Sequence, residues 1–181
     1  MADVLIPQLV ELATTEVMAR MQARFNDNLE IVYGKYTDAV SGPINLPKIP
    51  ADKFYISDAI DPLIVPAVFV VADRTDHDLT TAQNVAKQRH RMFVAVLGYD
   101  VEIQRLTRMS WRYATAAWIT LHDANLGTCH SLVRAIDYSP TYRSRGAKDV
   151  AGNRGFRKDV TLELEVLQYE AFQTPVPSLL G

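Results

Sequence analysis

The hydrophobic positions of the chain recur at helical spacing in two long stretches. From Pro7 to about Asp27, with fraying on toward Gly34 as a further option, the apolar side is formed by Val10, Ala13, Val17, Met21 and Phe25. From Glu102 to about Asn125, it is formed by Leu106, Met109, Tyr113, Ala116, Ala117 and Leu121, and Gly127 follows as a helix stop. One-sided stripes of this kind mark a helix face that covers a core, so we expect two helices packed on a sheet.

Four further stretches have the length and pattern of β-strands. Residues 66–72 and 91–99 are rich in β-branched and aromatic side chains and are apolar on both faces, which predicts inner strands covered on two sides. Residues 130–138 predict a third strand. In the last one, 158–172, apolar and acidic residues alternate, so one face is expected in the core and the other in water. The polar residues 73–90 predict a long projecting loop.

These elements predict a single α/β (α+β) domain over residues 1–181. We expect a mixed, mainly antiparallel sheet of about four strands, covered by two helices, with long loops or arms. The length suits one domain with a real core. The net charge of −2 gives no global bias toward nucleic acid. Cys129 is the single cysteine, which excludes an intrachain disulfide. With no secretory leader and no membrane-spanning run, we expect a protein made and used in a cytoplasm.

Residues 37–65 form a proline-rich arm. Its four prolines each remove a backbone donor, so no long helix or central strand fits there. Apolar side chains nevertheless recur through it, and two interpretations stay open: the arm packs on its own domain, or it reaches a neighbouring subunit. The possible subunit-contact residues of the arm are Ile44, Leu46, Ile49, Phe54 and Tyr55. The tail, 173–181, is expected to be an extended arm or a frayed end.

Trp111 and Trp118 lie seven residues apart on the second predicted helix, away from the centre of its core stripe. They can pack under the first helix, which is the interpretation we favour, or face another chain as further subunit contacts.

The stretch 143–158, between the last two strands, is basic and rich in glycine, which predicts a flexible loop. Its cations are Arg143, Arg145, Lys148, Arg154, Arg157 and Lys158, against Asp149 alone. Several cations on one mobile segment suit nucleic-acid phosphates, so this loop is the candidate lumen- or DNA-facing surface. The alternative is a hairpin tip kept soluble by its charge.

No glycine-rich phosphate loop, nucleophile elbow or paired-cysteine zinc pattern occurs in the sequence. Two groups invite a metal interpretation: His77 with Asp73, Asp76 and Asp78, and His122 and Asp123 with Cys129 and His130. In each group the potential ligands come from one short stretch, whereas structural zinc sites usually draw their ligands from two separate turns. We therefore expect no catalytic residue, no metal and no cofactor. An enzyme that uses the second group is the competing hypothesis.

Three motifs carry a family resemblance: RYATAAWITL in the second helix, AIDYSP closing the next strand, and RKDVTLELEV in the last strand. With the order of elements, they resemble the tail terminator (tail completion) proteins of tailed bacteriophages over about residues 66–170. The first helix matches in position only. The resemblance implies a small α/β protein that forms a hexameric ring at the head-proximal end of the tail tube. There it would stop tube polymerisation and provide the docking surface for the head.

The resemblance also implies partners and a location. The partners would be other copies of the chain, the tail tube protein, a head-completion or connector protein, and double-stranded DNA passing through the lumen. The location would be the neck region of the virion tail, after assembly in the host cytoplasm. The chain departs from the family in its longer proline-rich arm and its C-terminal tail. A different head–tail connector or neck protein is therefore the nearest alternative, and a small nucleic-acid-binding module is a further one.

Overall fold

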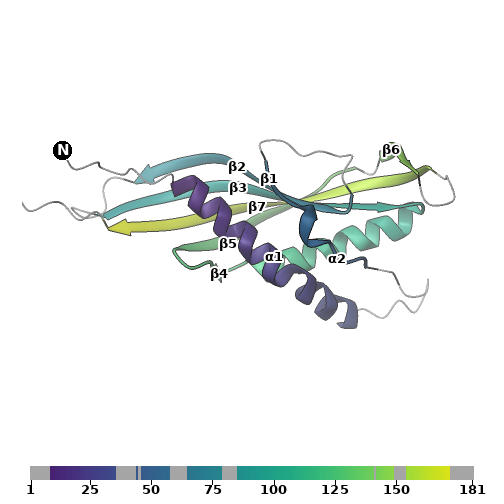
Figure 1. Ribbon diagram of the computed structural model, residues 1–181, viewed down its shortest axis with the longest axis horizontal. Helices are drawn as coiled ribbons and strands as arrows, with labels where there is room; N and C mark the ends of the chain where they lie inside the picture. Colours follow the sequence, from purple (N-terminus) through teal and green to yellow (C-terminus); the bar gives the residue numbers. More distant parts are fainter. Residues whose placement is uncertain are drawn as a thin grey trace, which may run out of the picture.

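The structure is a computed structural model, and it describes residues 9–35, 44, 46–57, 65–78, 85–140, 142–148 and 154–171. Figure 1 shows long strands side by side, with both helices on the same side of the sheet. The helices are α1 (Leu9–Lys35) and α2 (Ile103–Leu121), and a 3-10 turn spans Ala51–Lys53. The strands are β1 (Phe54–Ile56), β2 (Ala67–Asp78), β3 (Val85–Asp100), β4 (Ala124–Asn125), β5 (Cys129–Tyr138), β6 (Tyr142–Lys148) and β7 (Arg154–Ala171).

The sheet runs in the order β1-β2-β3-β7-β5-β4, and β6 also pairs with β7. β1 and β2 are parallel, whereas every other pairing in the described part of the chain is antiparallel. The prediction of a mixed, mainly antiparallel sheet with two helices is therefore confirmed. The strand number of about four is wrong, because six strands lie along the main path and β6 is a seventh. β1 and β4 are too short to leave a periodic pattern, and β6 lies in the basic stretch.

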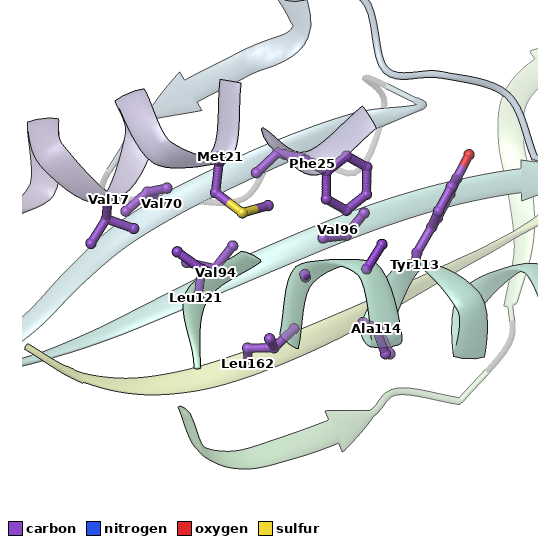
Figure 2. Packing of buried hydrophobic residues seen from close by; sticks show 14 of the residues in the cluster. Val17, Met21, Phe25, Val70, Val94, Val96, Tyr113, Ala114, Leu121 and Leu162 are labelled. Carbon is purple, nitrogen blue, oxygen red and sulfur yellow. The ribbon is translucent and has the colours of Figure 1, made fainter. Parts of the chain in front are cut away.

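The core lies between the helices and one face of the sheet. Alternate residues of the central strands, such as Val94 and Leu162, join side chains from both helices in one buried cluster. Figure 2 shows Met21 and Phe25 of α1 facing Tyr113 and the strands beneath. Rings of Phe25 and Tyr113 lie 5.9 Å apart between centroids. The predicted helical stripes thus do cover the sheet.

Both helix ends differ from the prediction. α1 continues as regular helix to Lys35, through the stretch toward Gly34 where fraying was expected, and Val32 of these turns is buried. α2 ends at Leu121, and the left-handed residue that follows it is Asp123, with φ 53°. Gly127, at φ 112°, lies instead in the turn between β4 and β5, where glycine adopts this conformation without strain.

The opposite face of the sheet changes character along its length. At one end a second buried cluster contains Ala67, Phe69, Ala95 and Leu97, which confirms burial on both faces for this part of β2 and β3. Farther along, charged side chains form rows across the strands. Arg91 pairs with Glu163 at 2.9 Å and with Asp73 at 3.5 Å, and Arg134 pairs with Glu165 at 2.8 Å.

The predicted projecting loop over 73–90 is wrong, because most of it is strand. β2 continues to Asp78 and β3 begins at Val85. On the helix side of this extension His90 is fully buried, and its ring nitrogens face Thr75 Oγ1 at 2.9 Å and Gln168 Oε1 at 3.3 Å. Polar partners across the strands satisfy these groups, so a polar sequence forms a buried ladder here.

A carboxylate fork fixes the passage from β3 into α2. Asp100 Oδ1 accepts a hydrogen bond from the backbone N–H of Glu102 at 2.9 Å. Arg105 donates to both carboxylate oxygens of Asp100, each at 2.6 Å. Asp100 therefore holds the first turn of α2 against the end of the strand, because a bidentate pair restrains orientation as well as distance.

Candidate assembly surfaces

The described part of the arm packs on its own domain. Ile44 and Ile49 are buried in the core at 3% and 1% exposure. The Asn26 side chain donates to the backbone oxygen of Ile49 at 2.9 Å and accepts from its N–H at 3.0 Å, and the Tyr113 hydroxyl donates to Pro47 O at 2.7 Å. Of the two interpretations, packing on its own domain is confirmed for these residues. Ile44 and Ile49 are not available to a neighbour.

Other arm residues are only partly covered. Leu46, Phe54 and Tyr55 are half-buried, and Tyr55 stacks on Phe69 with ring centroids 5.1 Å apart. Leu46 lines a shallow cavity of about 170 Å³ together with Tyr33. A role for these three residues in subunit contact stays a prediction. The arm residues 37–43, 45 and 58–64, and the tail 173–181, lie outside the described residues.

Trp111 and Trp118 form an exposed aromatic strip on α2. They are 53% and 41% exposed, and neighbouring Ile119 is 39% exposed. The interpretation that the two tryptophans pack under α1 is therefore wrong. α1 contacts the other side of α2, where Leu106, Met109, Tyr113 and Ala117 are already buried and leave no room for the indoles. The helix contains three arginines and no acidic residue.

A stacking contact orders one end of the strip. The Trp118 indole stacks on the imidazole of His122, with centroids 4.6 Å apart and planes 16° apart. The stack restricts the Trp118 side chain before any partner arrives. An ordered, exposed aromatic surface is typical of a site that binds another macromolecule, since aromatic side chains are enriched at such interfaces.

The predicted basic loop contains two strands. β6 covers Tyr142–Lys148 and β7 begins at Arg154. Arg157 and Lys158 are 4% and 8% exposed, so the prediction that they lie on an exposed flexible loop is wrong. The side chains of Arg143, Arg145, Lys148 and Arg154 lie outside the described residues, and their contact with DNA or a neighbour stays a prediction.

Lys158 has a structural role at the end of β5. Its ammonium group donates to the backbone oxygen of Ser139, and the Ser139 hydroxyl donates to Asp159 Oδ2 at 2.6 Å. These two bonds hold the end of β5 against β7. The partner of the lysine is thus a carbonyl of its own chain, which sequence spacing alone does not reveal.

The group at the turn after α2 does not converge on one point. His130 Nε2 lies 3.0 Å from Asp123 Oδ1, whereas His122 stacks on Trp118. Cys129 is buried, and burial raises the pKa of its thiol to about 11. The carboxylate of Glu16 accepts hydrogen bonds from the backbone N–H groups of Thr128 and Cys129, which ties α1 to this turn. Among the residues that the structure describes, no three His, Cys, Asp or Glu side chains gather to hold a metal.

The two outer edges of the sheet, which belong to β2 and β5 beyond the short strands β1 and β4, were not identified from the sequence. β1 pairs only with Val68–Val70 of β2, and β4 pairs only with His130 and Ser131 of β5. Beyond these points the outer backbone edges of β2 and β5 pair with no other described strand. Periodicity indicates that a segment is a strand, but strand order decides which strands are edges.

Comparisons with known proteins give little beyond the structure itself. No protein-family model and no curated protein matches the chain. A structural comparison finds similarity to a chain described as "Virion of native gene transfer agent (GTA) particle", with 16% sequence identity, over 82% of this chain and 97% of that one. The TM-score is 0.27, which is too low to support a conclusion about fold or role. Neither described helix has an apolar stretch of the length that crossing a membrane requires.

Proposed function

We propose that the protein is a structural subunit of a phage-type virion, which assembles as a ring at the head-proximal end of the tail tube. In this position it ends tube polymerisation and offers a surface to which the head docks. The motifs in α2, β5 and β7 that resemble those of tail terminators support this position at the end of the tail tube. The observation on which the assembly role depends is the exposed strip of Trp111 and Trp118 on α2.

Among the described residues, about half of each indole is left without a covering side chain. A buried aromatic side chain removes about 150–250 Å² from water, so covering the exposed half of each indole yields about 2–3 kcal/mol. Two such residues on one ordered helix face provide the central anchors that a stable interface needs. The buried core on the other side of α2 keeps this face in place.

The proposed partners are neighbouring copies of the chain, the tail tube protein and a head-completion protein. Double-stranded DNA would pass through the lumen. For the lumen we retain Arg143, Arg145, Lys148 and Arg154 as DNA-facing residues, and we exclude Arg157 and Lys158 because they are buried. Repetition of four cations around a ring would raise the local positive potential that phosphates experience.

Native mass spectrometry of the purified protein, alone and with its tail tube protein, tests the assembly role. We expect a closed ring, with six copies as the specific expectation, either free or on the end of the tube. A protein that stays monomeric in both conditions would contradict the proposal. For the lumen, replacing Arg143, Arg145 and Arg154 by glutamine should impair DNA passage in assembled particles while the ring still forms. Normal passage would remove the lumen assignment only.

A further inference from the structure

The two outer strands among the four long strands of the sheet run in opposite directions, so their edges can pair antiparallel between two copies. β2, β3, β7 and β5 are neighbours in that order, and each pair is antiparallel. β5 therefore runs opposite to β2. If a second copy stands beside the first with the same end up, its β2 edge meets the first copy's β5 edge as an antiparallel pair. Because each copy contributes four strands of alternating direction, the antiparallel alternation continues from one copy to the next.

The short strands β1 and β4 determine which parts of these edges are open. β1 covers β2 up to Val70, where the Ser57 N–H donates to the Val70 carbonyl at 3.1 Å. We call 71–78 the open part of β2, because no described strand pairs with its outer edge. β4 covers His130 and Ser131 of β5, and no described strand pairs with the outer edge of 132–138, which we call the open part of β5. The two open segments have similar lengths of eight and seven residues, and they lie toward opposite ends of the sheet.

The registers define how far a neighbour must shift. Through Val160 of β7 and Val96 of β3, Tyr138 lies level with Val68 in one subunit. Val68 is covered by β1, so a neighbour at the same level would collide with it. A shift of four residues, about 13 Å at roughly 3.3 Å per residue, places Tyr138 opposite Ala72, where the edge is open. An even shift also keeps each side chain on its own face of the sheet.

We propose that the β5 edge of one copy pairs antiparallel with the β2 edge of a second copy in this shifted register. Asp137 then lies opposite Arg74, Ile136 opposite Thr75, and Ala135 opposite Asp76. This inference rests on the proposed self-assembly and adds to it the surface and the register through which copies join. Because the two edges differ, the contact is head-to-tail and can close into a ring.

The charges on the two edges favour this register. Asp137 and Arg74 are both exposed and belong to the face opposite the helices. Within the described residues Asp137 forms no ion pair, and Arg74 pairs only with its neighbour Asp76, at 2.7 Å. Opposite charges directly across an antiparallel pair stabilise it, whereas like charges destabilise it.

Each edge also has a bulge that adds a charge to the pattern. The β2 pairing shifts at Asp73 and the β5 pairing shifts at Arg134. In the proposed register Arg134, which pairs with Glu165 of its own chain at 2.8 Å, lies beside Asp76 of the neighbour. Asp73 would approach Asp137, but its carboxylate already faces Arg91 of its own chain at 3.5 Å. Bulges and charges on an edge discourage unselective pairing, and here they leave one complementary partner.

Site-directed cross-linking tests the register. One single variant carries Arg74→Cys and the other carries Asp137→Cys; the native Cys129 is buried and stays in both. Mixed in equal amounts and oxidised, the two variants should give disulfide-linked dimers, whereas each alone should give none. The double variant should give a ladder on a non-reducing gel. The matched control pairs Arg74→Cys with Ala135→Cys, which lie on the same face but are displaced by two residues along the strand in the proposed register, too far for a disulfide.

Charge reversal provides the second readout. Arg74→Asp or Asp137→Arg alone should weaken self-association at least about tenfold, and a mixture or double variant should restore it. Both residues are exposed, and unchanged circular dichroism and melting confirm folding. A wild-type ring with no Arg74–Asp137 cross-link and no effect of reversal would overturn the edge pairing but leave the proposed function. A wild-type chain that stays monomeric even with tail tube protein would overturn both.

Discussion

On its inner side α2 buries Tyr113 completely and contacts α1 and the sheet, whereas on its outer side Trp111 and Trp118 are 53% and 41% exposed. Both sides have aromatic side chains, one on the inner side and two on the outer side, so hydrophobicity alone does not separate them. The difference lies in what covers them: α1 and the arm pack on the inner side, whereas on the outer side the only ring contact among the described residues is the stack of Trp118 on His122. The fold therefore depends on one side of this helix, and the other side is free to serve assembly.

The largest effect is expected from Tyr113→Ala on the inner side. The ring is fully buried against Phe25, and its hydroxyl donates to Pro47 O at 2.7 Å. Loss of the ring should lower the free energy of unfolding by about 3–5 kcal/mol, measured by urea denaturation. Tyr113→Phe keeps the ring and should lose only about 1 kcal/mol. A loss below about 1 kcal/mol for the alanine variant would contradict the described core.

A smaller effect is expected where the arm meets α1. Asn26→Ala removes both hydrogen bonds to the Ile49 backbone, at 2.9 and 3.0 Å. Because the freed backbone groups are partly buried, we expect a loss of about 1–3 kcal/mol and faster proteolytic cleavage around residue 50. Replacing exposed Asn125 instead leaves the arm untouched and serves as the control. Equal protease resistance of wild type and Asn26→Ala would show that the arm is not held here.

Trp111→Ala and Trp118→Ala, on the outer side of α2, should affect assembly much more than folding, in contrast to Tyr113→Ala. Neither indole belongs to the buried core cluster and about half of each is exposed, so each variant should lose only about 1 kcal/mol of stability, well below the loss for Tyr113→Ala. Assembly on the tail tube, followed by sedimentation, should be strongly reduced. If the two variants unfold as readily as Tyr113→Ala, the outer side belongs to the fold after all.

The smallest effect concerns Cys129, beside the inner core. Burial raises the pKa of its thiol to about 11, so little thiolate forms at pH 8. A thiol reagent should therefore react slowly with the native protein and completely after denaturation, as absorbance shows. Fast labelling of the native protein would mean that the turn at β5 opens readily. Glu16→Ala should accelerate labelling, because the Glu16 carboxylate holds the Thr128 and Cys129 N–H groups.

Much of the fold could be predicted from periodicity alone. The stripes of both helices and the alternation of Val160, Leu162 and Leu164 identified the core-facing positions that the structure confirms. The strand extensions around His90 could not be predicted, because their buried polar side chains are satisfied only by residues distant in sequence, such as Gln168. Lys158 was taken for an exposed cation for the same reason, since its acceptor is the carbonyl of Ser139.

The candidate surfaces were predictable to a lesser degree. The tryptophans were recognised as lying away from the core stripe, but their exposure depended on where α1 docks. The open edges of β2 and β5 depend on strand order and on the short strands β1 and β4, which have no periodic signal. A sequence pattern reports the environment of a side chain, whereas an edge is a property of the backbone and of its neighbours in space.

The fork between Asp100 and Arg105 has a consequence for any assembly of this chain. It fixes the angle at which α2 leaves β3, so the tryptophans have a set bearing relative to the sheet. If successive copies join at their sheet edges and close into a ring, every copy presents its indoles at the same height and in the same orientation to the ring axis. An incoming partner would then meet a preorganised collar and would lose little conformational entropy on docking.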